Sequence, residues 1–355
     1  MSFRFALIGC GRISKRHSDL LGNNEIKDAE LVAVCDLDIS KAKLISEKYN
    51  VPAYSDADQL MQTEKVDVIV VLTESGNHAK NVIELSKYGK HIMVEKPMAL
   101  TLDDADQMIK SCNDAGIKLF VIKQNRFNVP VQKLKEALDQ ERFGKLVLGT
   151  VRVRWCRPQE YYDQDSWRGT WALDGGILTN QASHHIDLLE WMMGDVESVQ
   201  AMSRTSLVNI EAEDTAIVNI NFKNGALGLV EATGATRPKD LEGSLSILGE
   251  KGSVVIGGFA VNKMETWNFE HQLDEDKFVL KNYSVNPPNV YGFGHKAYYD
   301  NVVESLKNKS VPLVDGLEGR RSLELINAIY HSIETKREVS LDEKNIVTKL
   351  GSKSE

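Results

Sequence analysis

The sequence predicts an α/β protein with a doubly wound parallel sheet at the N-terminus, followed by an α+β domain with an open, mainly antiparallel sheet. Up to residue 122, short apolar runs alternate with amphipathic helical patterns, as in a parallel sheet buried on both faces. From residue 151, apolar and charged residues alternate singly, which is typical of a sheet with one face in water. We therefore expect domains over residues 1–125 and 126–340 and a polar tail over residues 341–355.

The elements of the first domain follow from its apolar runs and turn residues. Thr101, with Asp104 three residues on, is an N-cap pattern, and Gly116 suits the position just after the same helix. Strands are expected at residues 4–8, 31–35, 51–54, 66–72, 91–94 and 119–122, and helices at residues 13–21, 40–49, 79–88 and 101–115.

In the second domain, turn residues separate the strands. Asn224-Gly225 and the run 249–252 are each expected to form a hairpin turn. Strands are expected at residues 151–155, 216–222, 226–230, 244–248 and 254–256, and helices at residues 180–193, 298–306 and 323–335.

The composition is that of an acidic globular protein. With 355 residues, 42% of them hydrophobic, and a net charge of -8, the chain can form two cores and offers no basic surface for nucleic acid. No apolar run is long enough to cross a membrane. The cysteines, Cys10, Cys35, Cys112 and Cys156, lack the spacing of disulfide or metal motifs, so we expect reduced thiols, no metal and a cytoplasmic location.

Residues 4–21 carry the pattern around which the first domain is organised. An apolar strand ends in Gly9-Cys10-Gly11 and a helical pattern follows, which is the context of a dinucleotide-binding turn. Gly9 allows a tight turn and Gly11 lets the backbone approach a pyrophosphate, while Ser14 stands where a third Gly or Ala is usual. Asp36 ends the next strand, where an acidic residue binds the ribose diol of NAD. An ordinary strand-to-helix turn is the alternative.

A lysine follows a later strand of the same sheet. Glu95-Lys96-Pro97 comes directly after a parallel strand, so it lies at the carboxyl edge, where such sheets bind ligands. Lys96 could hydrogen-bond a substrate hydroxyl and stabilise the alkoxide that forms as hydride leaves. A solvated surface lysine is the alternative.

The segment 174–193 is the other concentration of candidate residues. Asn180, His184 and Asp187 fall on one face of the predicted helix, at i, i+4 and i+7. We expect His184 to act as a base, with Asp187 orienting its ring, and His185 to pack against the core. A structural histidine is an equal alternative. A metal site is a weaker one, because adjacent helical histidines diverge.

Three arginines, Arg126, Arg157 and Arg168, lie in loops or at element ends, and the last two have aromatic neighbours in the sequence. Guanidinium groups bind phosphates and carboxylates, and aromatic rings offer faces to sugars or bases. The set suggests an anionic substrate that contains a ring, and ordinary surface ion pairs are the alternative. The aromatic neighbours are Tyr161, Tyr162, Trp167 and Trp171.

In this order, Gly9-x-Gly11, Glu95-Lys96-Pro97 and Gly175-Gly176…His184…Asp187 resemble the motifs of the Gfo/Idh/MocA oxidoreductases, over nearly the whole chain. That family joins a Rossmann domain to an open-sheet domain and uses its motif lysine and histidine in catalysis. The resemblance assigns these roles to Lys96 and His184. Many members have aspartate four residues before the histidine, where this chain has Asn180, so the resemblance does not carry over a proton relay to the lysine.

Four further segments, 123–127, 155–158, 167–169 and 179–185, resemble the WlbA/WbpB branch of the family. That branch oxidises C3 of UDP-N-acetylglucosaminuronic acid with NAD for surface polysaccharides, is typically tetrameric, and in some members reduces 2-oxoglutarate to regenerate NAD. The resemblance implies that the cofactor-binding residues are Gly9, Cys10, Gly11, Arg12, Ile13, Asp36, Thr73, Ser75, His78, Glu95, Lys96, Gln124, Trp167 and Arg168. It implies that the substrate-binding residues are Lys96, Arg126, Arg157, Tyr161, Thr179, Asn180 and His184.

We therefore expect an NAD-dependent sugar-nucleotide 3-dehydrogenase, a homotetramer without nucleic-acid or membrane partners. An inositol or simple-sugar dehydrogenase is the alternative within the same chemistry. A non-catalytic sensor that binds a dinucleotide and regulates a partner is the alternative from another class. The presence of both Lys96 and His184 favours the enzyme.

Overall fold

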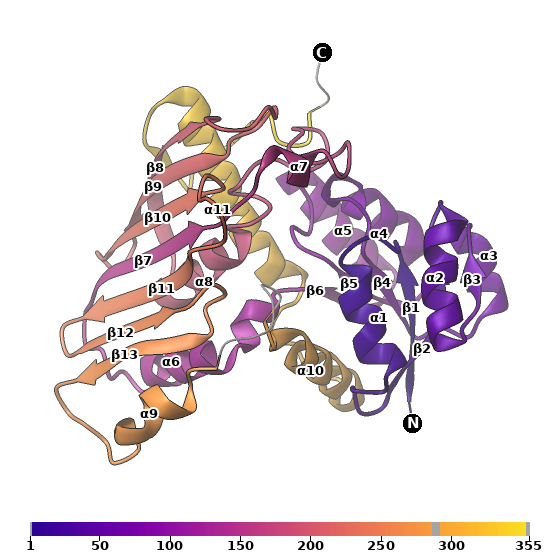
Figure 1. Ribbon diagram of the computed structural model, residues 1–355, viewed down its shortest axis with the longest axis horizontal. Coiled ribbons are helices and arrows are strands. Elements are labelled where there is room, and N and C mark those ends of the chain that lie inside the picture. Colours follow the sequence, from indigo (N-terminus) through magenta and orange to yellow (C-terminus); the bar gives the residue numbers. More distant parts are fainter. Residues whose placement is uncertain (1, 286–291, 353–355) are drawn as a thin grey trace. The chain divides into compact units, whose positions relative to one another are not determined.

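The computed structural model describes residues 2–285 and 292–352, which form two compact units (Figure 1). Unit 1 consists of Met1–Lys123 and His295–Arg321, and unit 2 consists of Gln124–Gly294 and Ser322–Glu355. The segment His295–Arg321 thus belongs with the N-terminal unit, whereas the expected domain boundaries placed it in the second domain.

Unit 1 is built on a six-stranded parallel sheet with the order β3-β2-β1-β4-β5-β6, which confirms the expected doubly wound sheet. The order reverses between β1 and β4, and open α/β sheets bind ligands at the carboxyl ends of such strands. The strands are β1 (Phe3–Ile8), β2 (Ala29–Cys35), β3 (Ala53–Tyr54), β4 (Val68–Val71), β5 (His91–Val94) and β6 (Leu119–Val121). The helices are α1 (Ser14–Gly22), α2 (Ile39–Tyr49), α3 (Ala57–Thr63), η1 (Ser75–Asn77), α4 (His78–Ser86), α5 (Leu102–Asp114) and, from its second residue, α10 (Gly294–Asn308).

The buried strand, the helix cap and the glycine after the helix that the sequence predicts in unit 1 are confirmed. All residues of β4 are buried, which explains its uninterrupted apolar run. The Thr101 side chain caps α5 by accepting a hydrogen bond from the Asp104 N–H at 3.2 Å. Gly116, just beyond the end of that helix, has φ +66°, which suits glycine.

Unit 2 is built on an eight-stranded sheet with the order β13-β12-β11-β7-β10-β9-β8-β14. The described pairs are antiparallel except β7 with β10, which confirms an open, mainly antiparallel sheet. The strands are β7 (Leu146–Arg154), β8 (Val196–Arg204), β9 (Thr215–Phe222), β10 (Leu227–Thr233), β11 (Glu242–Gly249), β12 (Gly252–Gly257), β13 (Lys263–Phe269) and β14 (Val339–Ser340). The helices are η2 (Gln124–Phe127), α6 (Val129–Asp139), α7 (Gln159–Tyr162), α8 (Ser183–Met193), α9 (Asp276–Asn282) and, from Ser322, α11 (Gly316–Thr335).

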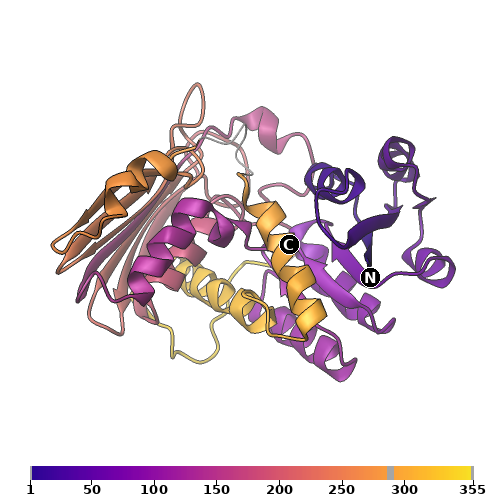
Figure 2. The same cartoon turned by 90° about the horizontal axis from the view of Figure 1, so that it is seen from below.

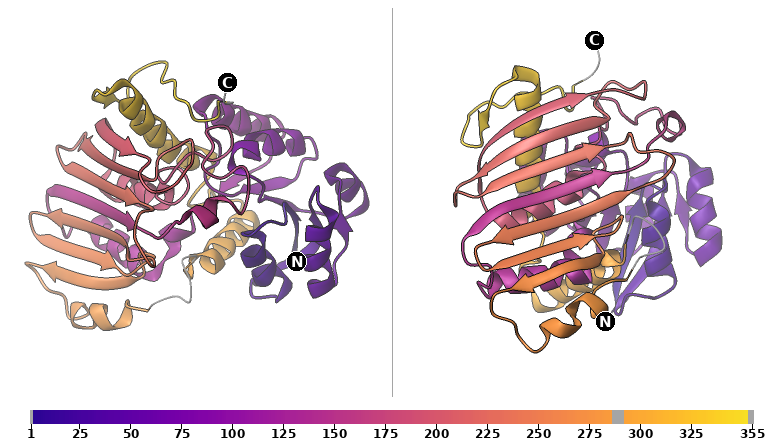
Figure 3. Two further views of the ribbon diagram at one scale, coloured as in Figure 1. Left: turned by 45° about the horizontal axis from the view of Figure 1, so that its top comes forward. Right: turned by 60° about the vertical axis from the view of Figure 1, so that its left-hand side comes forward.

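Helices cover one face of this second sheet. Helices α6 and α8 pack on its strands, and α11 runs along the same side (Figure 2). The right-hand view of Figure 3 looks onto the opposite face, where the strands from β8 to β11 lie uncovered. Because only one face of the sheet is covered, alternate residues of β9 are buried. Ala216, Val218, Ile220 and Phe222 are buried, and the residues between them are exposed.

Helix α8 approaches the sheet closely because glycines lie beneath it. A Cβ atom on Gly149 of β7 would lie 2.7 Å from the side chains of Leu189 and Met193, and one on Gly243 of β11 would lie 3.1 Å from Nε2 of His185. His185 is fully buried, and burial lowers its pKa to about 4. Its expected place in the core is confirmed.

The expected start of one helix was wrong. Helix α8 begins at Ser183 and not near residue 180, so Asn180 lies in the turns before the helix. The polar tail packs against unit 2 in its described part: Leu350 is buried and the N–H of Gly351 donates to the carbonyl of Trp171, whereas residues 353–355 lie outside the described part. Among the described residues, no helix combines the length and the apolarity that a membrane span requires.

Candidate functional site

The glycine turn after β1 has free space in front of it. Gly9 has φ +98°, and a Cβ atom there would lie 2.8 Å from the backbone of Leu72, so the turn requires glycine. A Cβ atom on Gly11, in contrast, would meet no atom of the described chain within 4 Å. The protein's own packing therefore does not require glycine at position 11, and the free space fits a ligand that approaches the backbone.

The start of helix α1 suits an anion. Its N-cap residue is Ile13, and no side chain in the described part of the molecule caps it. The N–H groups of Ser14 and Arg16 donate to the carbonyls of Gly11 and Ile13, so a phosphate would bind the other N–H groups at this end of the helix. Ser14 is buried and its hydroxyl donates to the carbonyl of Gly11 at 2.6 Å, which keeps the turn compact although a third glycine is missing. Arg12 is exposed beside it.

The carboxylate of Asp36 lies next to the same turn. It accepts hydrogen bonds from the N–H of Cys10 at 2.7 Å and from the N–H of Asp38 at 2.8 Å. These bonds hold a half-buried carboxylate at the end of β2, beside the glycine turn. A pyrophosphate at the turn and a ribose diol at Asp36 match this arrangement, so the residues of unit 1 fit NAD.

His78 joins two loops at the carboxyl edge of the sheet. Its Nδ1 lies 2.7 Å from the carbonyl oxygen of Pro97 and its Nε2 lies 3.0 Å from that of Thr73, and the ring is buried. Ser75, at the start of η1, is also buried. His78 therefore connects the loop after β4 to the loop after β5, and its ring nitrogens are engaged within the protein.

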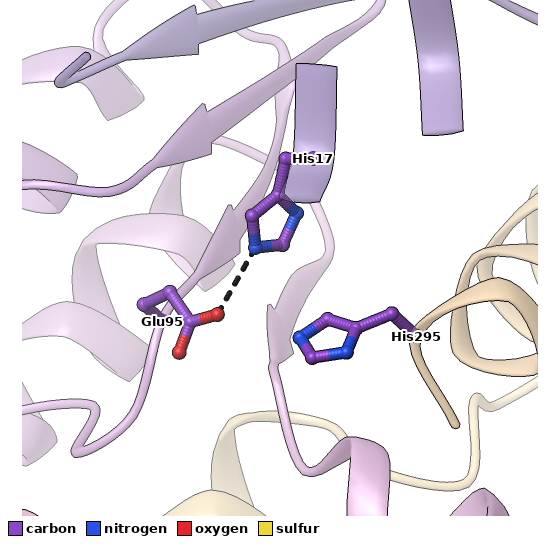
Figure 4. A group of neighbouring side chains, drawn as sticks. All are labelled: His17, Glu95 and His295. Carbon is purple, nitrogen blue, oxygen red and sulfur yellow. Dashed lines mark hydrogen bonds and ion pairs between the residues drawn. The ribbon is translucent and has the colours of Figure 1, made fainter. Parts of the chain in front are cut away.

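Glu95 likewise has partners inside unit 1 (Figure 4). One oxygen lies 3.0 Å from Nε2 of His17, and the other accepts the N–H of Lys96 at 3.0 Å. The opposite nitrogen of His17 lies 2.8 Å from the hydroxyl of Tyr299, and His295 packs edge-on against the His17 ring. Burial is the largest single effect and raises the pKa of Glu95, but the bond to His17 and the charges of His17, His295 and Lys96 together outweigh it and lower the pKa to about 2. The carboxylate thus stays charged and anchors the backbone of Lys96.

In unit 2, the partner of His184 differs from the expected one. Its Nε2 lies 3.1 Å from Nε2 of Gln124, and both side chains are buried. Asp187, which the helical spacing paired with His184, instead binds Arg126 through two hydrogen bonds of 2.8 and 2.9 Å. The expectation that Asp187 orients the His184 ring was wrong, because both oxygens of this carboxylate bind Arg126, which comes from a distant part of the sequence.

Arg126 consequently has an internal role. Its side chain and that of Asp187 are 3% and 2% exposed, and the guanidinium carbon lies 4.9 Å from the centre of the Trp191 ring. A buried pair with two hydrogen bonds is strongly destabilised when one partner is removed. The expected contact of Arg126 with substrate stays a prediction.

Arg157, Tyr161 and Arg168 form an aromatic and cationic cluster. The Arg157 guanidinium lies 5.2 Å and that of Arg168 4.7 Å from the centre of the Tyr161 ring, and Trp167 lies next to Arg168 at 4.6 Å. Arg157 also binds Asp240 at 3.0 Å, a partner that sequence reasoning missed because it comes 83 positions later without a local motif. The predicted arginine and aromatic set is therefore brought together, except for Arg126 and for Trp171, whose ring packs against Tyr330.

Thr179 and Asn180 belong to the turns before α8. Thr179 is fully buried and its hydroxyl lies 2.8 Å from that of Tyr330. Asn180 is half-buried and donates to Asp174 at 2.6 Å. Of these two predicted substrate residues, Asn180 is the one with an exposed surface.

Comparison with known proteins identifies the family. The model of its NAD-binding Rossmann fold matches residues 3–123, and the model of its C-terminal alpha/beta domain matches residues 135–341. The chain belongs to the Gfo/Idh/MocA oxidoreductase family. It is an NAD-dependent oxidoreductase, as the motifs indicated.

Several members of the Gfo/Idh/MocA family are similar over nearly the full length. The chain is 30% identical to myo-inositol 2-dehydrogenase of Thermotoga maritima, with 96% of this chain and 99% of that protein covered. Two solved structures, of WlbA dehydrogenases in complex with NADH and UDP-GlcNAcA, are more similar. The Bordetella pertussis protein is 41% identical with a TM-score of 0.89, covering 97% of this chain and 100% of that one. The Chromobacterium violaceum protein is 44% identical with a TM-score of 0.90, covering 97% of each chain.

The position of Asp36 predicts a preference for NAD over NADP in this Gfo/Idh/MocA member. A carboxylate that binds the ribose diol repels a 2′-phosphate, so NADH should bind about tenfold or more tightly than NADPH. Asp36→Asn should reduce this ratio because it removes the charge, whereas Asp342→Asn, at an exposed position of unit 2, should not change it. Titration of each reduced cofactor by calorimetry measures the ratio. Equal or tighter NADPH binding by the wild-type protein would contradict the assignment.

Proposed function

We propose that this oxidoreductase oxidises the C3 hydroxyl of UDP-N-acetylglucosaminuronic acid to the 3-keto sugar with NAD. The observation that supports the substrate most is the 41% and 44% identity to two WlbA dehydrogenases bound to UDP-GlcNAcA, over 97% of the chain. The cluster of Arg157, Tyr161 and Arg168 supports it further, because cations and aromatic faces suit a charged nucleotide sugar.

In this proposal His184 takes the proton of the reacting hydroxyl. Its Nε2 faces the amide nitrogen of Gln124 at 3.1 Å. With Gln124 as the donor, Nε2 is the unprotonated nitrogen whose lone pair accepts this hydrogen bond, and the neutral ring carries its proton on Nδ1. The substrate hydroxyl would replace the amide as the partner of Nε2. Gln124 therefore holds the ring in the tautomer in which Nε2 is the basic atom.

Lys96 stabilises the negative charge that develops on the same oxygen. Its backbone is anchored by Glu95, which in turn is held by His17. An ammonium group at a pre-arranged position stabilises an alkoxide without reorganisation during the reaction. Bound NAD supplies the acceptor for the hydride from C3.

An inositol or simple-sugar dehydrogenase is the second candidate. The identity of 30% to myo-inositol 2-dehydrogenase over 96% of the chain favours it. This identity is, however, lower than the 41% and 44% to the two WlbA dehydrogenases, and Arg157 and Arg168 already bind Asp240 and Asp165 and so do not by themselves exclude a neutral polyol. We therefore rank it below the nucleotide sugar.

We also propose that the chain forms a homotetramer, with 2-oxoglutarate as a candidate acceptor that regenerates NAD. The uncovered sheet face supports association, because Met202, Ile217 and Leu227 on it are 67%, 47% and 55% exposed. The cytoplasmic location stays a prediction.

Substitution of either proposed catalytic side chain should strongly lower turnover without loss of cofactor binding. Lys96→Met keeps the aliphatic length and removes the charge, and His184→Asn removes the base. Each should lower kcat by about a hundredfold or more, the usual scale for a general base or a charge-stabilising donor. Stopped-flow or steady-state formation of NADH measures kcat, and NADH titration checks the cofactor site.

His185→Asn is the matched control on the same helix. Because His185 is buried in the core, this variant should lower the melting temperature while the folded fraction stays active. Loss of turnover in His185→Asn with normal turnover in His184→Asn would show that the roles of the two histidines are reversed.

The substrate carboxylate should decide specificity. UDP-N-acetylglucosaminuronic acid should outperform UDP-N-acetylglucosamine in kcat/KM by about a hundredfold, because the analogue keeps the diphosphate but lacks the C6 carboxylate, which leaves a cation that binds this carboxylate without its partner. Arg157→Ala should raise KM for the uronate far more than KM for NAD, whereas Arg204→Ala, at an exposed strand end, should change neither. Turnover of free inositol or glucose together with no turnover of any UDP-uronate, even with 2-oxoglutarate present, would contradict the proposed substrate.

A further inference from the structure

Glu213 is a buried carboxyl group in unit 2 that the proposed mechanism does not use. It lies just before β9 and is 3% exposed. Its Oε1 accepts hydrogen bonds from the N–H of Leu178 and from the hydroxyl of Tyr330, both at 2.9 Å. Its main-chain carbonyl accepts the N–H of Ile177, also at 2.9 Å. One residue therefore binds two consecutive N–H groups of the segment 175–182, which we call the substrate loop.

The two glycines of the substrate loop allow this contact. A Cβ atom on Gly176 would lie 2.2 Å from the carbonyl oxygen of Glu213 and 2.4 Å from its carboxyl group. Gly175 has φ +80°, in the region that favours glycine. The Gly175-Gly176 pair is thus the place where Glu213 contacts the backbone of the substrate loop closely.

Tyr330 of α11 extends the contact along the loop. Its hydroxyl accepts the N–H of Gly176 at 3.2 Å and lies 2.8 Å from the hydroxyl of Thr179. The ring is buried and packs edge-on against Trp171. Glu213 and Tyr330 together therefore hold the loop from Gly176 to Thr179.

The held segment leads directly into the proposed site. Asn180 follows Thr179, helix α8 begins at Ser183, and His184 is the next residue. A displacement of the loop would move Asn180 and the start of α8 together. Because proposed binding and catalytic residues follow the loop without a break, its position matters for substrate binding.

Within residues 2–285 and 292–352, no cationic side chain forms a hydrogen bond or ion pair with the Glu213 carboxyl group. Its Oε2 has no hydrogen-bond partner among the described residues, and the titratable groups that face it are Asp174 of the preceding loop, Tyr162 of α7 and Tyr330. Burial, with a smaller contribution from Asp174, raises the pKa of Glu213 to about 7. Its carboxyl group therefore changes charge near neutral pH.

We propose that Glu213 is the positioning residue of the substrate loop, and that its neutral form keeps the loop in the arrangement that binds substrate. When the group loses its proton, a buried and unbalanced negative charge opposes Asp174 and loosens the loop. This proposal rests on the proposed function for its kinetic consequence, but the effect on the loop itself does not depend on the substrate.

Three variants separate positioning from general stability. Glu213→Gln keeps an acceptor for Leu178 and Tyr330 and cannot ionise. Glu213→Ala removes the acceptor, and Tyr330→Phe removes only the hydroxyl that reaches Thr179. Glu338→Gln, at an exposed position of the same unit, is the matched control.

The kinetic readout is KM for UDP-N-acetylglucosaminuronic acid and for NAD from about pH 6 to about pH 8.5. In the wild type, KM for the sugar nucleotide should rise as the pH increases through about 7, while in Glu213→Gln it should stay flat within about twofold. Glu213→Ala should raise KM for the sugar nucleotide about tenfold, Tyr330→Phe should raise it less, and KM for NAD should stay within about twofold in all variants. A folded Glu213→Ala with wild-type KM values, or the same pH profile in Glu213→Gln and wild type, would overturn the proposal.

A second readout does not need the substrate. Hydrogen exchange should show that the amides of Ile177 and Leu178 lose protection in Glu213→Ala and keep it in Glu213→Gln and Glu338→Gln. If the wild type does not turn over any UDP-uronate, the proposed function fails, and this exchange pattern still decides the role of Glu213. If Glu213→Ala does not fold, Glu213→Gln decides the role of Glu213. Because the carboxyl pKa is raised from 4.5 to about 7, the folded state keeps the proton that the unfolded state loses between these pH values, so the melting temperature of the wild type should fall relative to that of Glu213→Gln from about pH 4.5 to about pH 7 and level off above it. Equal pH dependence of the melting temperatures of the wild type and Glu213→Gln would contradict the proposed role of Glu213.

Discussion

A carboxylate that is moved out of water loses several kcal/mol of hydration, which only hydrogen bonds or a nearby cation can offset. Each unit contains a buried carboxylate that binds within or next to the segment that carries its proposed functional residues. Glu95 anchors the backbone of Lys96 in unit 1, and Asp187, on the same helix as His184, binds Arg126 in unit 2. Glu213 holds the loop that precedes this helix. The functional segments therefore depend on a few buried acids whose removal leaves polar groups without partners.

The strands could be predicted from the sequence because the burial of a strand leaves a regular pattern of apolar residues along it. In β4 all residues are buried and the apolar run is uninterrupted, while in β9 only alternate residues are buried and the pattern alternates. The start of α8 could not be predicted from its own residues. The segment before it forms turns because Glu213 and Tyr330, distant in the sequence, bind its N–H groups. The pair Gly175-Gly176 was the local signal that could have indicated a break there.

Residues of the candidate site were predictable where a short motif carries the chemistry. The turn from Gly9 to Gly11 and the carboxylate of Asp36 lie together as expected, because the spacing of strand, turn and helix is local. The helical spacing also separated His185, in the core, from His184. It could not identify the partners of His184 and Asp187, since Gln124 and Arg126 come about sixty positions earlier and only the folded chain brings them close.

The central claim is that hydride leaves C3 of a UDP-uronate. Incubation of the enzyme and NAD with UDP-N-acetylglucosaminuronic acid that carries deuterium only at C3 tests it most directly, with mass spectrometry of the cofactor and the sugar product. The account predicts that the deuterium appears in the reduced cofactor and that the product is a 3-keto sugar without deuterium. Reduced cofactor without deuterium, formed while the sugar keeps its label, would show that oxidation occurs at another carbon and would contradict the account.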